Sequence, residues 1–233
     1  MPPGERIYVV GDVHGRSDLL DGVARWIEAD MVRDNSRCMT IFLGDYVDRG
    51  PDSRGVLDRL SSGDFPTEVA ALRGNHEEML LQFLEDETML DSWRRYGGLE
   101  TLTSYGVKVA DVMRGQNYDV AREELRARIP GRHIEFLEGL GLSAAIGDYF
   151  FCHAGVRPGL PLEDQQSSDL LWIRGDFLNF GESFGKRIVH GHTPVEKPDF
   201  RPNRINIDTG AFVSGALTCL VLEDERTSVF TSR

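Results

Sequence analysis

Residues 39–50 read MTIFLGDYVDRG, a short apolar run followed at once by glycine and a group of charged side chains. A run of five apolar or β-branched residues that ends at glycine is typical of a buried β-strand. Residues 7–10 (IYVV) and 69–72 (VAAL) have the same character, and each is followed by a polar segment that contains glycine. The sequence therefore predicts three buried strands, each ending in a polar turn.

Helical patterns separate these strands. Residues 17–32 repeat apolar side chains every three or four positions, and Ser17 is the predicted N-cap. Residues 51–62 have a similar pattern, with Pro51 predicted in the first turn. Strands that alternate with helices predict right-handed crossovers onto a mainly parallel sheet.

The rest of the chain divides into a helical and a strand-rich part. Residues 77–140 are acidic and helical in pattern, whereas the segments after Gly139 are short and strand-like. We therefore expect an α/β fold of two packed mixed β-sheets flanked by helices. Residues 1–233 are predicted to form a single domain, with a mainly helical insertion at about 77–140, because no linker or repeat interrupts them.

Composition excludes several classes of protein. The 233 residues carry a formal net charge of −12, which argues against a nucleic-acid partner and against attraction to an anionic membrane. No apolar run approaches the roughly 20 residues that span a bilayer, and the N-terminal segment lacks the features of a signal peptide. We expect a cytoplasmic protein; the sequence does not indicate its oligomeric state.

Polar segments with metal-binding residue types follow the predicted strands. They are GDVHG (11–15), GDYVDRG (44–50), RGNHE (73–77), CHAG (152–155) and VHGHTP (189–194). Alone, a glycine–aspartate pair is typical of a turn and a single histidine of a structural hydrogen bond. Together, the segments contain more Asp, His and Asn residues than turns require. Ligands bind at the carboxyl ends of strands in such sheets, and we expect these residues to converge there. Carboxylate, imidazole and amide groups without thiolates suit divalent manganese, iron or zinc.

In this order, the five segments resemble the signature blocks of the phosphoprotein phosphatase family, within the calcineurin-like metallophosphoesterases. The resemblance runs from Gly11 to Thr193 and is closest to the short bacterial and phage members. It implies the αββα metallophosphoesterase sandwich and two divalent metal ions. Manganese is the expected metal, with iron or zinc as alternatives.

The resemblance also implies which residues bind these metals. The first metal would be held by Asp12, His14 and Asp45. The second would be held by Asp45, Asn75, His153 and His192, and Asp45 would bridge the two.

Four further residues match groups that act on the substrate. The resemblance implies that Arg49 binds the phosphate, and that Arg174, in LLWIR, is a second phosphate-binding arginine. His76 matches the histidine that acts as general acid, and Asp48 matches the aspartate that pairs with it.

The activity that the resemblance implies is hydrolysis of phosphoserine or phosphothreonine in proteins. A metal-bridging hydroxide would attack phosphorus, and His76 would protonate the leaving alkoxide. The alternative is a symmetrical diadenosine tetraphosphate hydrolase, or another small-molecule phosphoesterase with the same site. Such tetraphosphate hydrolases commonly have alanine where Asp48 stands, which favours the protein phosphatase.

Two other classes of protein are less compatible with the sequence. A nuclease or cyclic-nucleotide phosphodiesterase of this superfamily would have a further histidine where Pro194 stands. A non-catalytic metal-binding scaffold would lack some of the matched residues, and none is missing.

Several polar residues near these segments have more than one interpretation. Arg73 and Glu77 either flank the active site or form a surface ion pair. His190 either supports a metal ligand or packs as a structural histidine. Asp208 is expected to stabilise a turn. Helical spacing favours a core position over a substrate platform for three aromatic residues, Trp93, Tyr96 and Tyr105.

Overall fold

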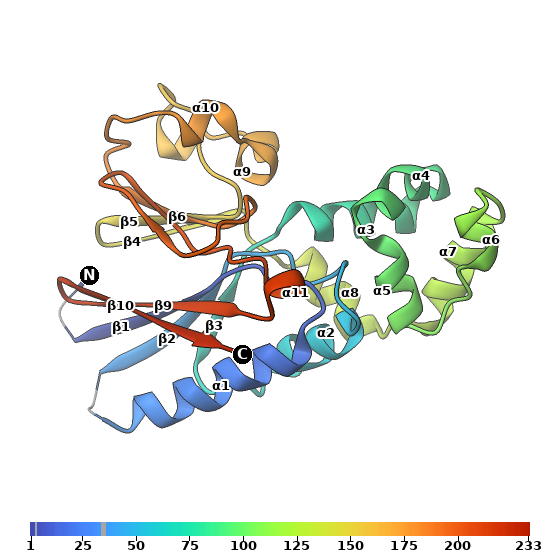
Figure 1. Ribbon diagram of the computed structural model, residues 1–233, viewed down its shortest axis with the longest axis horizontal. Coiled ribbons are helices and arrows are strands. Elements are labelled where there is room, and N and C mark those ends of the chain that lie inside the picture. The colour runs from blue at the N-terminus through green and yellow to red at the C-terminus, as the bar shows by residue number, and fades with distance from the viewer. Residues whose placement is uncertain (3, 34–35) are drawn as a thin grey trace.

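Two mixed five-stranded β-sheets pack face to face in the computed structural model, which describes residues 1–2, 4–33 and 36–233 (Figure 1). The first sheet has the order β10-β9-β1-β2-β3 and the second the order β4-β5-β6-β8-β7. The strands of the first are β1 (Glu5–Val10), β2 (Arg37–Phe42), β3 (Glu68–Ala71), β9 (Leu217–Glu223) and β10 (Arg226–Ser232). Those of the second are β4 (Ser143–Ile146), β5 (Tyr149–Cys152), β6 (Arg187–His190), β7 (Asp199–Phe200) and β8 (Arg204–Asn206).

The three strands predicted from the N-terminal half lie side by side. Strands β1, β2 and β3 are parallel, with Ile7 opposite Met39 and Thr40 opposite Val69. Helices α1 (Ser17–Met31) and α2 (Ser53–Ser61) connect them and cover the outer face of the first sheet (Figure 1). The predicted α/β fold with two mixed sheets flanked by helices is confirmed.

Both predicted helix starts are wrong in detail. Arg16 occupies the N-cap position of α1, and Ser17 is its first helical residue. The Ser17 hydroxyl instead donates to the carboxylate of Asp52, at 2.5 Å. Asp52 is the N-cap of α2 and accepts a hydrogen bond from the amide of Gly55, so Pro51 precedes the helix. The aspartate caps α2 because its carboxylate accepts an otherwise unpaired first-turn amide.

A helical segment lies between β3 and β4, in agreement with the pattern predicted for residues 77–140. Its α-helices are α3 (Asn75–Glu85), α4 (Leu90–Trp93), α5 (Gly98–Ser104), α6 (Ala110–Met113), α7 (Tyr118–Arg128) and α8 (Gly131–Glu138). Two 3₁₀ helices, η1 (Glu87–Met89) and η2 (Arg94–Tyr96), connect some of them. Helices α3 to α7 extend to one side of the sheets in Figure 1, and α8 returns beside α2.

Short helices complete the second half of the chain. They are η3 (Leu162–Asp164), α9 (Ser167–Trp172), α10 (Gly175–Leu178) and α11 (Ala211–Ser214). Helices α9 and α10 cover the outer face of the second sheet (Figure 1). Within the residues that the structure describes, no helix combines the length and the apolar character needed to cross a membrane.

Strand β1 shows why the N-terminal strands are continuously apolar. Ile7 and Val9 face the second sheet and join an inter-sheet core with Ile41. Tyr8 and Val10, which alternate with them, belong to the core beneath the outer helices. Both faces of the strand are therefore buried, which removes the usual alternation of apolar and polar residues.

We expect Ile41→Ala to lower the free energy of unfolding by about 2–5 kcal/mol. Ile41 is fully buried between the sheets, and truncation leaves a cavity that neither sheet can close without moving. Denaturant unfolding should be compared with Val32→Ala, because Val32 is 84% exposed and its truncation should change stability little. Equal effects of the two substitutions would contradict the inter-sheet core.

Candidate dinuclear metal centre

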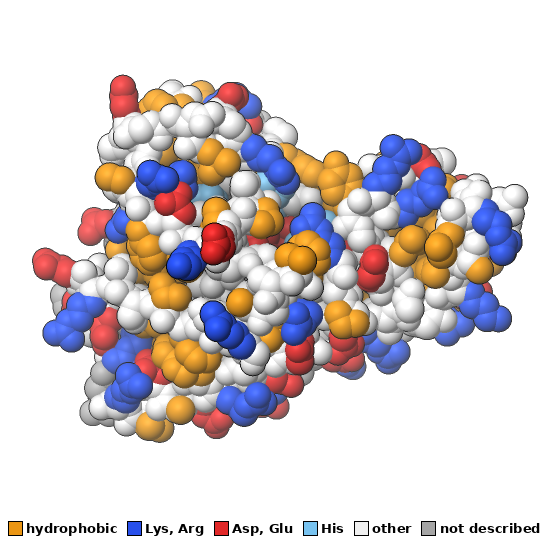
Figure 2. All heavy atoms as spheres, in the orientation of Figure 1, with side chains coloured by type: hydrophobic (Ala, Val, Ile, Leu, Met, Phe, Trp, Pro, Cys, Tyr) orange, Lys and Arg blue, Asp and Glu red, His pale blue; other side chains and the backbone are white. Residues whose placement is uncertain are grey.

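The predicted metal ligands are gathered where strands of both sheets end. Each lies in the segment that follows β1, β2, β3, β5 or β6, and each is at most 5% exposed. They are Asp12, His14, Asp45, Asn75, His153 and His192. Figure 2 shows pale blue histidine atoms in the hollow between the part with the second sheet and the rest of the molecule.

The backbone of these segments is held in an uncommon conformation. His14, Asp45 and His192 have positive φ angles of 44°, 54° and 63°, and Asp48 and Arg49 have 73° and 66°. These are five of the seven non-glycine residues with positive φ in the part of the chain that the structure describes. Each such residue costs about 1–3 kcal/mol and persists only where its surroundings enforce it. The strain is therefore concentrated at the predicted site.

Two glycines are required because carboxylates pass close to their α-carbons. A Cβ atom at Gly74 would lie 2.2 Å from Asp45 Oδ1, and one at Gly191 would lie 2.0 Å from Asp12 Oδ1. These distances are far shorter than any side chain tolerates. The glycines before Asn75 and His192 therefore allow the carboxylates to reach the centre.

Four of the ligand candidates converge on one side of the site. Asn75 Oδ1 lies 2.9 Å from His153 Nε2 and 2.8 Å from His192 Nδ1. His153 Nε2 is also 3.4 Å from Asp45 Oδ1. The structure thus places Asp45, Asn75, His153 and His192 together, as the predicted second metal site requires.

Asp45 also faces the group on the other side. Its Oδ2 lies 3.4 Å from His14 Nε2 and 3.8 Å from His76 Nε2. The side-chain atoms of His14, Asp45 and His76 that can bind a metal lie within 4.8 Å of one another, as do those of Asp45, His153 and His192. Asp12 is in neither of these groups, but its carboxylate accepts the amide of His192, a member of the second group, at 3.0 Å. Asp45 occupies the shared position that a bridging ligand needs.

Two of the imidazoles present an unprotonated ring nitrogen to the cluster. His14 Nδ1 lies 2.8 Å from the carbonyl of Val47, and His153 Nδ1 lies 3.0 Å from that of Leu43. A carbonyl only accepts, so both rings carry their proton on Nδ1 and turn the lone pair of Nε2 toward the cluster. Burial lowers the pKa of His14 to about 3, which keeps this ring neutral.

One atom of this group has no partner. His14 Nε2 is buried without a hydrogen bond to any described residue. A buried lone pair is costly unless something occupies it. Together with the oxygen and imidazole donors of the cluster, it fits a divalent cation of the manganese, iron or zinc type.

His76 and Asp48 form a buried hydrogen-bonded pair. His76 Nδ1 lies 2.6 Å from Asp48 Oδ2, which also accepts a hydrogen bond from Trp93 Nε1 at 2.7 Å. Thr101 Oγ1 donates to Asp48 Oδ1 at 2.6 Å. Burial opposes protonation of His76, but the nearby carboxylates of Asp45 and Asp48 outweigh it and raise its pKa.

Sequence reasoning missed the two residues that hold Asp48. Trp93 is buried, as its spacing predicts, but its indole N–H also fixes the carboxylate. Thr101 follows on α5 and orients the other oxygen. Both come from the helical segment, 45 and 53 positions away from Asp48, and no local pattern marks them.

Both predicted phosphate-binding arginines lie at the rim of the site. Arg49 Nη2 is 3.1 Å from His76 Nε2, and its guanidinium carbon lies 5.1 Å from the centre of the Phe212 ring. Arg174 donates from Nε to His192 Nε2 at 3.0 Å. The structure therefore brings one guanidinium next to each side of the cluster. Phe212, a further contact of this site, was not anticipated.

The surface ion-pair interpretation of Arg73 and Glu77 is wrong. Glu77 is fully buried and accepts hydrogen bonds from backbone amides, including that of Asp45. Arg73 instead pairs with the next residue, Glu78, at 3.1 Å. The reason is helical geometry, because Glu77 on the first turn of α3 points back toward the helix start.

Asp208 is both a turn residue and a neighbour of the site. Its Oδ1 accepts the amide of Gly210 at 2.9 Å, as expected of a turn. It is also buried close to Asp12, and burial together with the charge of Asp208 raises the pKa of Asp12. The expectation that it is only structural is therefore incomplete.

The three aromatic residues singled out in the helical segment differ in how far they are buried. Trp93 and Tyr105 are buried, but the core position predicted for Tyr96 is wrong, because this ring is 39% exposed. Its centroid lies 6.2 Å from that of His76 and 6.0 Å from that of Trp172, which is 38% exposed. The Trp172 ring lies 6.0 Å from His192. An exposed aromatic pair thus borders the site.

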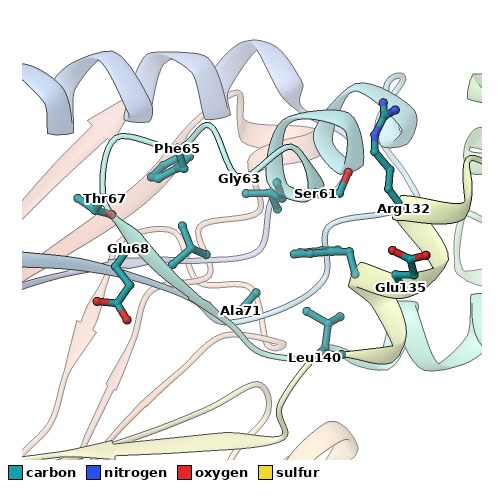
Figure 3. A pocket seen from close by; sticks show the side chains of 13 residues that line it. Ser61, Gly63, Phe65, Thr67, Glu68, Ala71, Arg132, Glu135 and Leu140 are labelled. Carbon is teal, nitrogen blue, oxygen red and sulfur yellow. The ribbon is translucent and has the colours of Figure 1, made fainter.

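A separate pocket of about 600 Å³ lies between β3 and α8 (Figure 3). It is lined by apolar and polar side chains, among them Phe65, Arg132, Glu135 and Leu140. None of the predicted site residues lines it. The chemistry described above is therefore located elsewhere, at the strand ends.

The chain is similar in sequence to known phosphoesterases. The sequence model of the calcineurin-like phosphoesterases matches residues 5–212. The chain is 28% identical to an asymmetrical bis(5'-nucleosyl)-tetraphosphatase, PrpE, of Anoxybacillus flavithermus, over 91% of this chain and 88% of that protein. It is 29% identical to serine/threonine-protein phosphatase 1 of Salmonella typhimurium, over 91% and 89%.

A solved structure has the same fold. It belongs to a protein provisionally named a diadenosine tetraphosphatase, and it aligns with a TM-score of 0.68 over 99% of this chain and 95% of that one. The sequence identity is 19%, so this likeness bears on the fold alone.

We expect His192→Ala to lose one bound metal ion and His190→Ala to retain two. His192 Nδ1 faces the cluster, whereas His190 packs against Phe177 with centroids 4.9 Å apart and hydrogen-bonds Gly191. Metal stoichiometry of the purified variants, measured by elemental analysis, tests this. Loss of a metal from the His190 variant alone would mean that His190, and not His192, is the ligand of the second site.

Proposed function

Because this chain belongs to the calcineurin-like phosphoesterase family, as the five segments indicated, we propose that it removes phosphate from phosphoserine and phosphothreonine in proteins. The observation that carries this choice is the His76–Asp48 pair at the edge of the metal cluster. Hydrolysis of a phosphoester follows from the family; the protein substrate is the proposed part.

Two divalent cations, with manganese expected, would be held by the residues of the cluster. These are Asp12, His14 and Asp45 on one side, and Asp45, Asn75, His153 and His192 on the other. When bound, such a pair supplies Lewis acidity and a water molecule of lowered pKa. The buried carboxylates of Asp12 and Asp45 supply the negative charge that would balance the cations.

The two arginines would bind the phosphoryl group. Arg49 and Arg174 stand on opposite sides of the cluster, next to His76 and His192 respectively. A guanidinium has only donors and forks onto two oxygens of a phosphate. Their charge would be most favourable when negative charge spreads over the phosphoryl oxygens during transfer.

His76 would protonate the leaving oxygen. Asp48 holds its Nδ1, so Nε2 is directed toward the site and would give a proton to the oxygen as its bond to phosphorus breaks. The alkoxide of serine or threonine is a strong base and a poor leaving group, so it gains from a proton donor. A nucleotide phosphate is a weaker base and gains less. This difference favours an alkyl phosphomonoester over a phosphoanhydride.

A bis(5'-nucleosyl) tetraphosphate is the second candidate substrate. The exposed rings of Tyr96 and Trp172 border the site at His76 and His192, and exposed aromatic faces stack on nucleobases. The relative from Anoxybacillus flavithermus carries the name of an enzyme of this activity.

A substrate panel separates the two candidates. With manganese present, we expect the highest kcat/KM on a phosphoserine peptide, compared with free phosphotyrosine, diadenosine tetraphosphate and bis-p-nitrophenyl phosphate. The reason is the proton donor that an alkoxide requires. A clear preference for diadenosine tetraphosphate would make the second candidate the better assignment.

We expect His76→Asn to lower kcat on a phosphoserine peptide by roughly 10² or more. The proposed role is proton donation, so metal content should stay at the wild-type level. The loss should be smaller on p-nitrophenyl phosphate, whose leaving group needs little protonation. Equal losses on both substrates would show that His76 is not the acid.

A further inference from the structure

Glu77 makes a concentrated set of contacts with the segments that carry the site. Its Oε1 accepts the amides of Tyr46 and Val47 at 2.7 and 3.3 Å. Its Oε2 accepts those of Asp45 and Gly74, both at 2.8 Å. One fully buried carboxylate therefore binds four amides from two different turns.

One of these amides belongs to a residue with a strained backbone. Asp45 has φ 54° and follows Gly44, which has φ 103°. A residue keeps such a conformation only where neighbouring contacts enforce it. Glu77 accepts hydrogen bonds from the amides of Asp45 and of the two residues after it, and the bond from Gly74 ties this turn to the turn that precedes Asn75.

We propose that Glu77 is a positioning residue that sets the metal affinity of the centre by clamping the Asp45 turn onto the Asn75 turn. The proposal rests on the dinuclear centre proposed above. Asp45 faces both metal groups, and Asn75 faces one of them, so a change in the distance between the two turns alters both. Glu77 acts through the backbone of these two turns, because its carboxylate accepts their amides.

The arrangement makes glutamine an informative substitution. Each carboxylate oxygen accepts two amides, and glutamine replaces one oxygen by an NH₂ group that only donates. Whichever way the side-chain amide is turned, two backbone N–H groups face a donor. Glu77→Gln thus keeps the size and shape of the side chain but removes two of its four hydrogen bonds to backbone amides.

The neighbouring residue is a matched control. Glu78 lies on the same turn of α3, but its carboxylate is 31% exposed and pairs with Arg73. Glu78→Gln therefore makes the same chemical change, on the same helix, without touching the Asp45 turn.

The test is the affinity for manganese alone, measured by calorimetry on metal-free protein well below the unfolding temperature. We expect Glu77→Gln to raise the Kd for manganese by about 10- to 100-fold, as loss of a group that orients metal ligands typically does. Glu78→Gln should bind manganese like the wild type. Circular dichroism confirms that the variants compared are folded, which separates positioning from a loss of structure.

Wild-type manganese affinity in folded Glu77→Gln would overturn the proposal. If that variant does not fold, Glu77→Asp replaces it, because aspartate keeps two acceptor oxygens but is one methylene shorter. Its manganese-dependent rise in Tm should then be smaller than that of the wild type, and an equal rise would overturn the proposal. A wild type that binds manganese but hydrolyses no phosphoester would contradict the proposed function alone.

Discussion

The site depends on one buried carboxylate, that of Asp45. It faces His14 and His76 with one oxygen and His153 with the other, so it joins the two halves of the cluster. A carboxylate this deep in the protein is unfavourable unless cations or donors surround it. Asp45 reaches this position through a left-handed backbone conformation, and its carboxylate passes where a side chain at residue 74 would lie, so glycine is required there.

The two sheets explain why the ligands meet at all. Parallel strands β1, β2 and β3 deliver Asp12, Asp45 and Asn75 at one edge, and β5 and β6 deliver His153 and His192 from the opposing sheet. Their convergence requires that the sheets be packed face to face, and the apolar inter-sheet core provides this packing. The stability of the core and the geometry of the site are therefore linked.

The helical segment contributes to the site from outside the sheets. Trp93 and Thr101 hold Asp48, and through it His76, while Tyr96 places an exposed ring at the rim. Under the proposed function, this segment would therefore orient the proton donor through Asp48 and place an aromatic ring beside the substrate.

The sequence by itself determined the fold class, because apolar runs that end in glycine are a local pattern. It also predicted a ligand set, through the resemblance of the Asp, His and Asn segments to the signature blocks of a known family. Only the tertiary structure decided the roles of Glu77, Trp93 and Tyr96. From the sequence, Glu77 either flanks the active site or forms a surface ion pair, whereas in the structure it accepts the amide of Asp45. Trp93 is buried as its spacing predicts, but only the fold shows that it donates to Asp48, 45 positions away. Tyr96 follows the helical spacing of a core residue, yet the packing of the helices leaves its ring exposed. Contacts between distant segments produce no periodic pattern, so they cannot be predicted from a single sequence.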